Sequence, residues 1–126
     1  MAVKWLNVAE VDVTDDALLI RLTTEAKVPV KLTKAVAAAG TGVALAADGT
    51  YARALWLTAK KVGGGNVGNV FVGDGDVDKT TDQQTVLEPG DYWEAPIPPG
   101  VVVDLNDIYV DAANNDDGVT GGYVPA

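Results

Sequence analysis

Short apolar runs separated by turn residues are the feature that most restricts how this chain can fold. From Val28 onward, Pro-Gly, Asp-Gly and glycine-rich segments recur at intervals of roughly 8–12 residues. Between them, apolar and polar residues alternate with a period of two, which places successive side chains on opposite faces of a strand. This pattern, without a long helical period, predicts an all-β fold. Within that class we expect a single antiparallel β-sandwich, jelly-roll-like in its topology.

The strongest strand signal lies in residues 51–72. Leu55 and Leu57 alternate with their neighbours before a glycine-rich link, and Val70 and Val72 do so after it. We expect these two runs to pair as a hairpin at the centre of the sheet. A second hairpin is expected over residues 42–57, with Asp48-Gly49 as its two-residue turn. The remaining strand candidates are residues 28–33, 84–90, 91–100, 101–105, 107–112 and 118–124.

Length and the N-terminal sequence indicate how the chain is organised. A chain of 126 residues is expected to form one domain. We assign residues 28–126 to the sandwich and residues 1–27 to an N-terminal arm. Thr14 could cap a helix within this arm, but we favour an extended arm with a strand that places Leu18, Ile20 and Leu22 on one face. The start of the chain lacks a secretory signal pattern, and no apolar run reaches the ~20 residues that span a bilayer.

The alternation also predicts which side chains form the core. Each of them is apolar and lies at an inward position of a predicted strand. The predicted core residues are Leu32, Val43, Leu45, Leu55, Leu57, Val70, Val72, Val86, Leu87, Val102, Leu105, Ile108 and Val110.

The composition argues against enzymatic activity. The chain has no cysteine and no histidine. Disulfides, thiolate metal sites and nucleophiles paired with histidine are therefore excluded. A two-carboxylate glycosidase would need a distinguishable acid–base pair, and the sequence singles out none. We predict no enzyme, no catalytic residues and no cofactor.

Two motifs resemble ligand-binding signatures only in part. Gly63, Gly65 and Gly68 match G-x-G-x-x-G, but a strand follows them where a dinucleotide site needs a helix. Residues 74–78 have the D-x-D-x-D spacing of a calcium loop, but Lys79 replaces the required glycine. We predict no metal site, although a looser calcium site formed by acidic loops stays open. Its candidate carboxylates are either Asp74, Asp76 and Asp78, or Asp111, Asp116 and Asp117.

The net charge of −9 is unevenly distributed. Residues 1–61 contain eight Lys and Arg against six Asp and Glu, whereas residues 62–126 contain one against twelve. A field of this sign repels phosphate backbones, so we expect no binding to nucleic acid. The acidity itself favours solubility. It also fits an assembly unit whose near-neutral half docks while its acidic half faces water.

Three blocks of sequence, taken together, resemble small structural proteins of tailed-bacteriophage virions. The blocks are an N-x-G-N-V-(Y/F)-V-G-D strand, an L-x-P-G turn, and an L-x-x-I-Y-V-D strand followed by a short G-V strand. The matching residues are Asn66, Gly68, Asn69, Val70, Phe71, Val72, Gly73 and Asp74, then Leu87, Pro89 and Gly90, then Leu105, Ile108, Tyr109, Val110 and Asp111, and finally Gly118 and Val119. The resemblance implies a head-decoration-like virion component and no catalytic residues.

We therefore expect a bacteriophage capsid decoration (cement) protein that binds the outer surface of the head and stabilises it. Its partner would be the major capsid protein, and it would act as a homo-oligomer, with a trimer one possibility. We expect it on the virion, assembled in the host cytoplasm, with no membrane contact. The expected interface residues are Trp5, Leu18, Leu19, Ile20, Lys31, Lys34 and Arg53. The alternative is a receptor- or carbohydrate-binding module of a tail or head fibre that uses Tyr92, Trp93 and the acidic loops.

Overall fold

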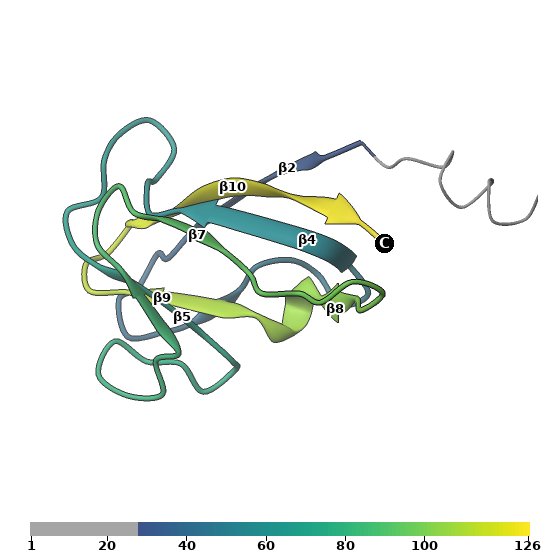
Figure 1. Cartoon of the computed structure of the whole chain (residues 1–126). Helices are drawn as coiled ribbons and strands as arrows, with labels where there is room; N and C mark the ends of the chain where they lie inside the picture. The colour runs from purple at the N-terminus through teal and green to yellow at the C-terminus, as the bar shows by residue number, and fades with distance from the viewer. Residues whose placement is uncertain (1–27) are drawn as a thin grey trace, which may run out of the picture.

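A computed structural model describes residues 28–126, which form two antiparallel sheets stacked as a β-sandwich (Figure 1). The predicted all-β class is confirmed. The larger sheet has the order β2 (Val30–Ala35), β10 (Gly118–Pro125), β4 (Tyr51–Thr58) and β7 (Tyr92–Glu94), and the short β8 (Val103–Asp104) also pairs with β4. The smaller sheet has the order β3 (Val43–Ala44), β9 (Tyr109–Ala112), β5 (Val70–Gly73) and β6 (Thr85–Leu87). A 3-10 turn, η2 (Leu105–Asp107), joins β8 to β9.

The strand pairs are nested around the β5–β6 connection. β5 pairs with β6, β4 with β7, β3 with β9 and β2 with β10, all antiparallel. Most connections between consecutive strands therefore pass from one sheet to the other. Two connections stay within one sheet. β5 leads to β6 in the smaller sheet, and β7 leads to β8 in the larger one, where both β7 and β8 lie along β4.

The two predicted hairpins are wrong. β4 lies between β10 and β7 in the larger sheet, whereas β5 lies between β9 and β6 in the smaller one. The link over residues 59–69 is longer than a hairpin loop of roughly two to five residues, and it crosses between the sheets. The turn at Asp48-Gly49 does form, with a φ of 85° at Gly49. It too joins strands of different sheets, because β3 pairs with β9 rather than with β4.

The core between the sheets contains most of the predicted residues. Leu55, Leu57 and Leu105 have no exposed surface, and Val43 and Ile108 pack against the core while half-buried. The prediction is wrong for Val86 and Val102, which are 47% and 51% exposed. The other predicted residues are buried, namely Leu32, Leu45, Val70, Val72, Leu87 and Val110. The prediction missed Val36, Ala52, Ala59, Ala112 and Val119.

A second buried cluster lies on the outward side of the smaller sheet. Phe71 and Asp111 are paired across β5 and β9, and by alternation they face away from the main core. They are nevertheless only 6% and 0% exposed. Two loops pack here: the backbone N–H of Gly40 donates to Asp111 Oδ1 at 2.9 Å, and Val77 lies against Gly42 and Gly73. Loops therefore cover part of this side of the sandwich.

Candidate functional site

The predicted interface residues that the structure describes lie on the larger sheet, but not all on one side. Lys31 on β2 is exposed and, by alternation with the buried Leu32, faces outward. Arg53 on β4 is also exposed, and it lies at the β-bulge between Ala52 and Ala54. Lys34 is half-buried, and by alternation it shares the side of Leu32, which faces the core. Lys31 and Lys34 therefore lie on opposite sides of β2. Four predicted residues lie outside the described range, namely Trp5, Leu18, Leu19 and Ile20.

The outward side of the larger sheet forms a broad surface, here called the docking face. Two rows of residues in register cross it. One row runs through Lys31, Gly122, Trp56 and Glu94, and the other through Thr33, Thr120, Thr58 and Tyr92. Apart from Gly122, which is buried beneath Trp56, these residues are exposed or half-buried.

Trp56 lies at the centre of the docking face, where a glycine makes room for it. A Cβ atom on Gly122 would come within 2.8 Å of Cζ2 and 3.1 Å of Cε2 of the indole. The ring therefore lies across the backbone of β10, toward β2. Trp56 is half-buried, so part of a large apolar surface stays accessible. Aromatic residues of this kind are enriched in protein interfaces.

The docking face differs in charge from the rest of the molecule. Its two rows carry one cation, Lys31, and one anion, Glu94. At its edge lie Arg53 in β4 and Asp104 in β8, which faces away from the core opposite Tyr51. The charges of this surface are therefore balanced in a chain whose net charge is −9. Low charge density around an aromatic centre is typical of the core of a binding patch.

The glycine-rich link forms a loop held by buried polar contacts, which the sequence analysis missed. The Asp117 carboxylate, with no exposed surface, accepts hydrogen bonds from the backbone N–H groups of Val67 and Gly68. The Asn66 amide donates to the Gly118 carbonyl at 2.8 Å and accepts from the Gly118 N–H at 3.1 Å. These contacts tie the loop to the start of β10. As predicted, a strand rather than a helix follows the G-x-G-x-x-G match.

The acidic β5–β6 loop is organised by its own hydrogen bonds. Asp78 accepts from both the backbone N–H and the hydroxyl of Thr80, each at 2.9 Å, and these bonds lower the pKa of Asp78. Asp74 accepts from the N–H of Asp76 in the same way. Within residues 28–126, no group of three or more acidic side chains is placed to hold a metal ion.

Asp104 organises the junction between β8 and η2. Its carboxylate accepts from the backbone N–H of Asn106 at 3.0 Å, which caps η2, and from that of Gly49 at 3.1 Å. These two bonds lower the pKa of Asp104, since both favour the ionised carboxylate. The contact joins the β3–β4 turn to the end of β8.

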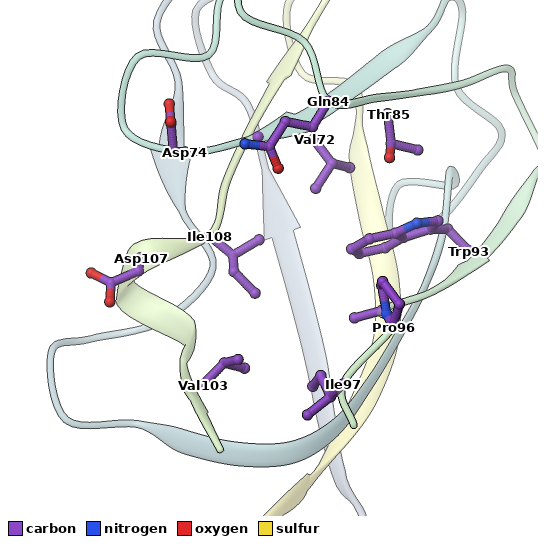
Figure 2. A pocket seen from close by; sticks show the side chains of 12 residues that line it. Val72, Asp74, Gln84, Thr85, Trp93, Pro96, Ile97, Val103, Asp107 and Ile108 are labelled. Carbon is purple, nitrogen blue, oxygen red and sulfur yellow. The ribbon is translucent and has the colours of Figure 1, made fainter. Parts of the chain in front are cut away.

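A cleft of about 300 Å³ opens between the two sheets, on the side where β6 and β7 form their edges (Figure 2). The Trp93 indole projects into it, with Ile108 and Val72 on the side of the smaller sheet. Trp93 and its neighbour Tyr92 point to opposite sides of β7, because Trp93 packs against the core whereas Tyr92 is 60% exposed. The two aromatic residues therefore do not form a common platform.

Comparisons with known proteins give no assignment. No family model matches the chain, and neither a curated protein nor a solved structure does. Among the described residues, no helix is long and apolar enough to cross a membrane.

Proposed function

We propose that this chain is a bacteriophage capsid decoration protein that binds the outer surface of the head through the docking face. The observation that carries the proposal is the accessible sheet surface around Trp56, which carries balanced charge on a strongly acidic molecule and is left open by the other described residues. A protein that binds only the assembled shell stabilises that shell by mass action. Repeated over many copies, an interface of roughly 1,200–2,000 Å² would resist the outward pressure of packaged DNA.

We further infer a jelly-roll topology. The nested pairs β5–β6, β4–β7, β3–β9 and β2–β10 support it, because they are the pairs made when one long antiparallel hairpin is rolled into two sheets. Eight strands in two sheets is the usual jelly-roll composition, and viral capsid proteins are among the proteins that use it. The short β8 is an addition along β4.

The motifs behind the resemblance to phage structural proteins meet in space. Asn66, in the first block, exchanges hydrogen bonds with the backbone of Gly118, in the last. The backbone carbonyl of Asn69 accepts from the N–H of Ala113, two residues after the I-Y-V-D strand. The spacing of these blocks thus has a structural basis, which supports a shared fold with the proteins that the chain resembles.

The docking face changes the set of residues that we propose for the interface with the capsid. We propose that Lys31 and Arg53 contact the capsid together with Trp56 and Thr58. Lys34 would contribute less, because it lies on the other side of β2. The arm of residues 1–27 stays part of the proposal, as an extension that reaches a neighbouring subunit, and so does assembly as a homo-oligomer such as a trimer.

The test is co-sedimentation of the purified chain with empty heads of the phage that encodes it. Lys31→Glu combined with Arg53→Glu should weaken binding at least about tenfold, because it reverses both cations of the proposed contact. Lys79→Glu is the control for a charge reversal elsewhere on the molecule, since Lys79 is exposed on the β5–β6 loop and its reversal should leave binding unchanged. Equal binding by both variants would contradict the proposed face. Absence of the chain from purified virions would contradict the function.

The alternative function, as a receptor- or carbohydrate-binding module of a fibre, has less structural support than capsid decoration. Lectin domains also use jelly rolls, but Tyr92 and Trp93 face opposite sides of β7 and cannot stack on one sugar ring together. Electron microscopy of virions labelled with an antibody against the chain separates the two functions. Label over the head surface supports decoration, whereas label confined to fibres supports the alternative.

A further inference from the structure

The cleft between the sheets has an apolar interior built from both layers. Trp93 forms one wall, Val72 and Ile108 line the side of the smaller sheet, and Ile97 and Val103 line the far end (Figure 2). Apart from Val72, which is buried, these side chains are half-buried and pack against the main core. They thus present apolar surface to an open cavity of about 300 Å³.

The charged side chains at the cleft do not enter it. Asp74 and Asp107 lie at its margin, and their carboxylates point away from the apolar interior (Figure 2). None of the residues that line the cleft is Lys or Arg. Because a charge buried there would find no partner, the interior fits apolar side chains rather than a charged ligand.

The cleft opens between two strand edges that have no partner among the described strands. β6 ends the order of the smaller sheet, and β7 ends that of the larger one. Along β7, the N–H of Ala95 donates to the Leu55 carbonyl of β4 at 2.9 Å. Since alternate residues of an edge strand bond to its one neighbour, the N–H and C=O groups of Tyr92 and Glu94 point away from β4. These groups can accept a further strand through main-chain hydrogen bonds.

A strand that pairs with β7 would place every second side chain over the cleft, beside Trp93. The N-terminal arm contains an alternation of this kind, because Leu18, Ile20 and Leu22 share one face of the strand expected there. On the opposite face of the same strand, Arg21 would join the docking face. The arm therefore offers both the apolar side chains and the backbone that the cleft lacks.

The arm of the same chain is too short to supply this strand. It leads into β2, and β2 and β7 are opposite edges of the larger sheet. Four strand spacings, about 19 Å in all, separate β2 from a strand added beyond β7. The six steps from Leu22 to Val28 reach at most about 21 Å when fully extended. The sheet itself blocks the straight line, and a path over its side chains or around the strand ends exceeds this reach. A second copy of the chain has no such restriction.

We propose that residues 17–22 of a second copy of this chain pair with the free edge of β7 and seat Leu18, Ile20 and Leu22 in the cleft. Each copy thereby completes the sandwich of its neighbour by strand addition. Because the donor and acceptor surfaces differ, the contact is head-to-tail and forms a closed ring when the rotation closes, such as the trimer proposed above. The contact needs no capsid, so it is separate from binding of the docking face to heads.

Disulfide crosslinking of the full chain tests the proposal, because the parent sequence has no cysteine. Ala95→Cys, in the cleft lining, is combined in turn with Leu18→Cys, Leu19→Cys and Ile20→Cys. Ala95 would face the added strand in a non-hydrogen-bonded pair, whose Cα spacing of about 4.5 Å suits a disulfide. On non-reducing gels we expect linked species larger than one chain. The strongest link should form at Leu18 or Ile20 and exceed that at Leu19, on the opposite face, at least about tenfold. The single-cysteine variants give the background.

Sedimentation velocity of chains without cysteine gives a second readout. Leu18→Asp with Ile20→Asp should weaken self-association at least about tenfold, because two carboxylates would have to enter an apolar cavity. Leu19→Asp, on the other face of the strand, is the matched control and should leave self-association unchanged. A monomeric parent chain, links confined to single chains, or equal effects at the two faces would overturn the proposal. Neither readout involves heads, so the result is independent of whether the docking face binds a capsid.

Discussion

Asp117 holds Gly68 across the connection between the two sheets. The carboxylate Oδ2 accepts the Gly68 N–H at 2.8 Å and the Val67 N–H at 3.0 Å, and none of the Asp117 side chain is exposed. Lys61 Nζ lies 3.8 Å from Oδ1. The glycine-rich link thus has a defined shape although it has no regular secondary structure.

Replacing Asp117 by Asn should destabilise the fold by about 1.5–3 kcal/mol, because the amide lacks the charge that strengthens these bonds and its NH₂ group faces a backbone donor. Urea denaturation at neutral pH measures the change. Asp116→Asn is the control at the neighbouring position: Asp116 is exposed, and its φ of 69° is one that Asn adopts readily. It should change the free energy of unfolding by less than about 0.5 kcal/mol. Equal effects of the two variants would contradict the role of Asp117.

Two glycines should respond in opposite ways to alanine. Gly121 lies in β10 between β2 and β4, and a Cβ there would collide with the carbonyl of Trp56. Because both neighbouring strands are hydrogen-bonded to β10, Gly121→Ala should cost at least about 2 kcal/mol. Gly65 lies in the link with open space around it and without a positive φ. Gly65→Ala should be neutral or stabilise the fold by up to about 1 kcal/mol, and thermal unfolding of the pair tests both expectations.

The pKa shifts predict how acid affects stability. Asp78 and Asp104 have pKa values lowered below the ordinary 3.8, so the unfolded chain binds protons more tightly than the folded one. Their contribution is complete above the ordinary pKa and is lost as the pH falls from there through the lowered values. We therefore expect melting temperatures to fall below about pH 4. Asp104→Asn should flatten this dependence while keeping a good cap for η2. If Asp104→Asn leaves the acid limb of the melting curve as steep as in the parent, the lowered pKa of Asp104 does not contribute to stability.

Neighbouring residues of β6 should differ sharply in their effect on stability. Leu87 is 4% exposed and packs in the core, whereas Val86 is 47% exposed on the other side of the strand. Leu87→Ala should cost about 2–5 kcal/mol. Val86→Ala should cost less than about 0.5 kcal/mol. Chemical denaturation of the two variants tests this orientation directly, and a larger loss for Val86→Ala would show that the strand faces the other way.

The sequence predicted the strands better than their partners. Alternation placed Leu55, Leu57, Val70 and Val72 correctly in the core, since burial depends on the local period. It could not show that β4 and β5 lie in different sheets, because both sheets bury their side chains in the same core. The length of the link between them was the available signal, and it pointed away from a hairpin.

Part of the candidate site could be predicted from the sequence. Lys31 and Arg53 were predicted to lie near an interface; both are exposed on the larger sheet, and Lys31 faces outward. Lys34 was grouped with them, although the period of two separates it from Lys31. Trp56 was read only as part of an alternating strand. Its accessible position depends on Gly122, a pairing between distant strands that no local pattern reveals.

The position of β10 has a consequence for synthesis of the chain. Among the described strands it is the last along the chain, yet it lies inside the larger sheet, with β2 on one side and β4 on the other. Until β10 has left the ribosome, the edges of β2 and β4 that pair with it have no partner among the described strands. A nascent chain that stalls before β10 would therefore expose two unpaired strand edges, which can pair with other chains in the cell.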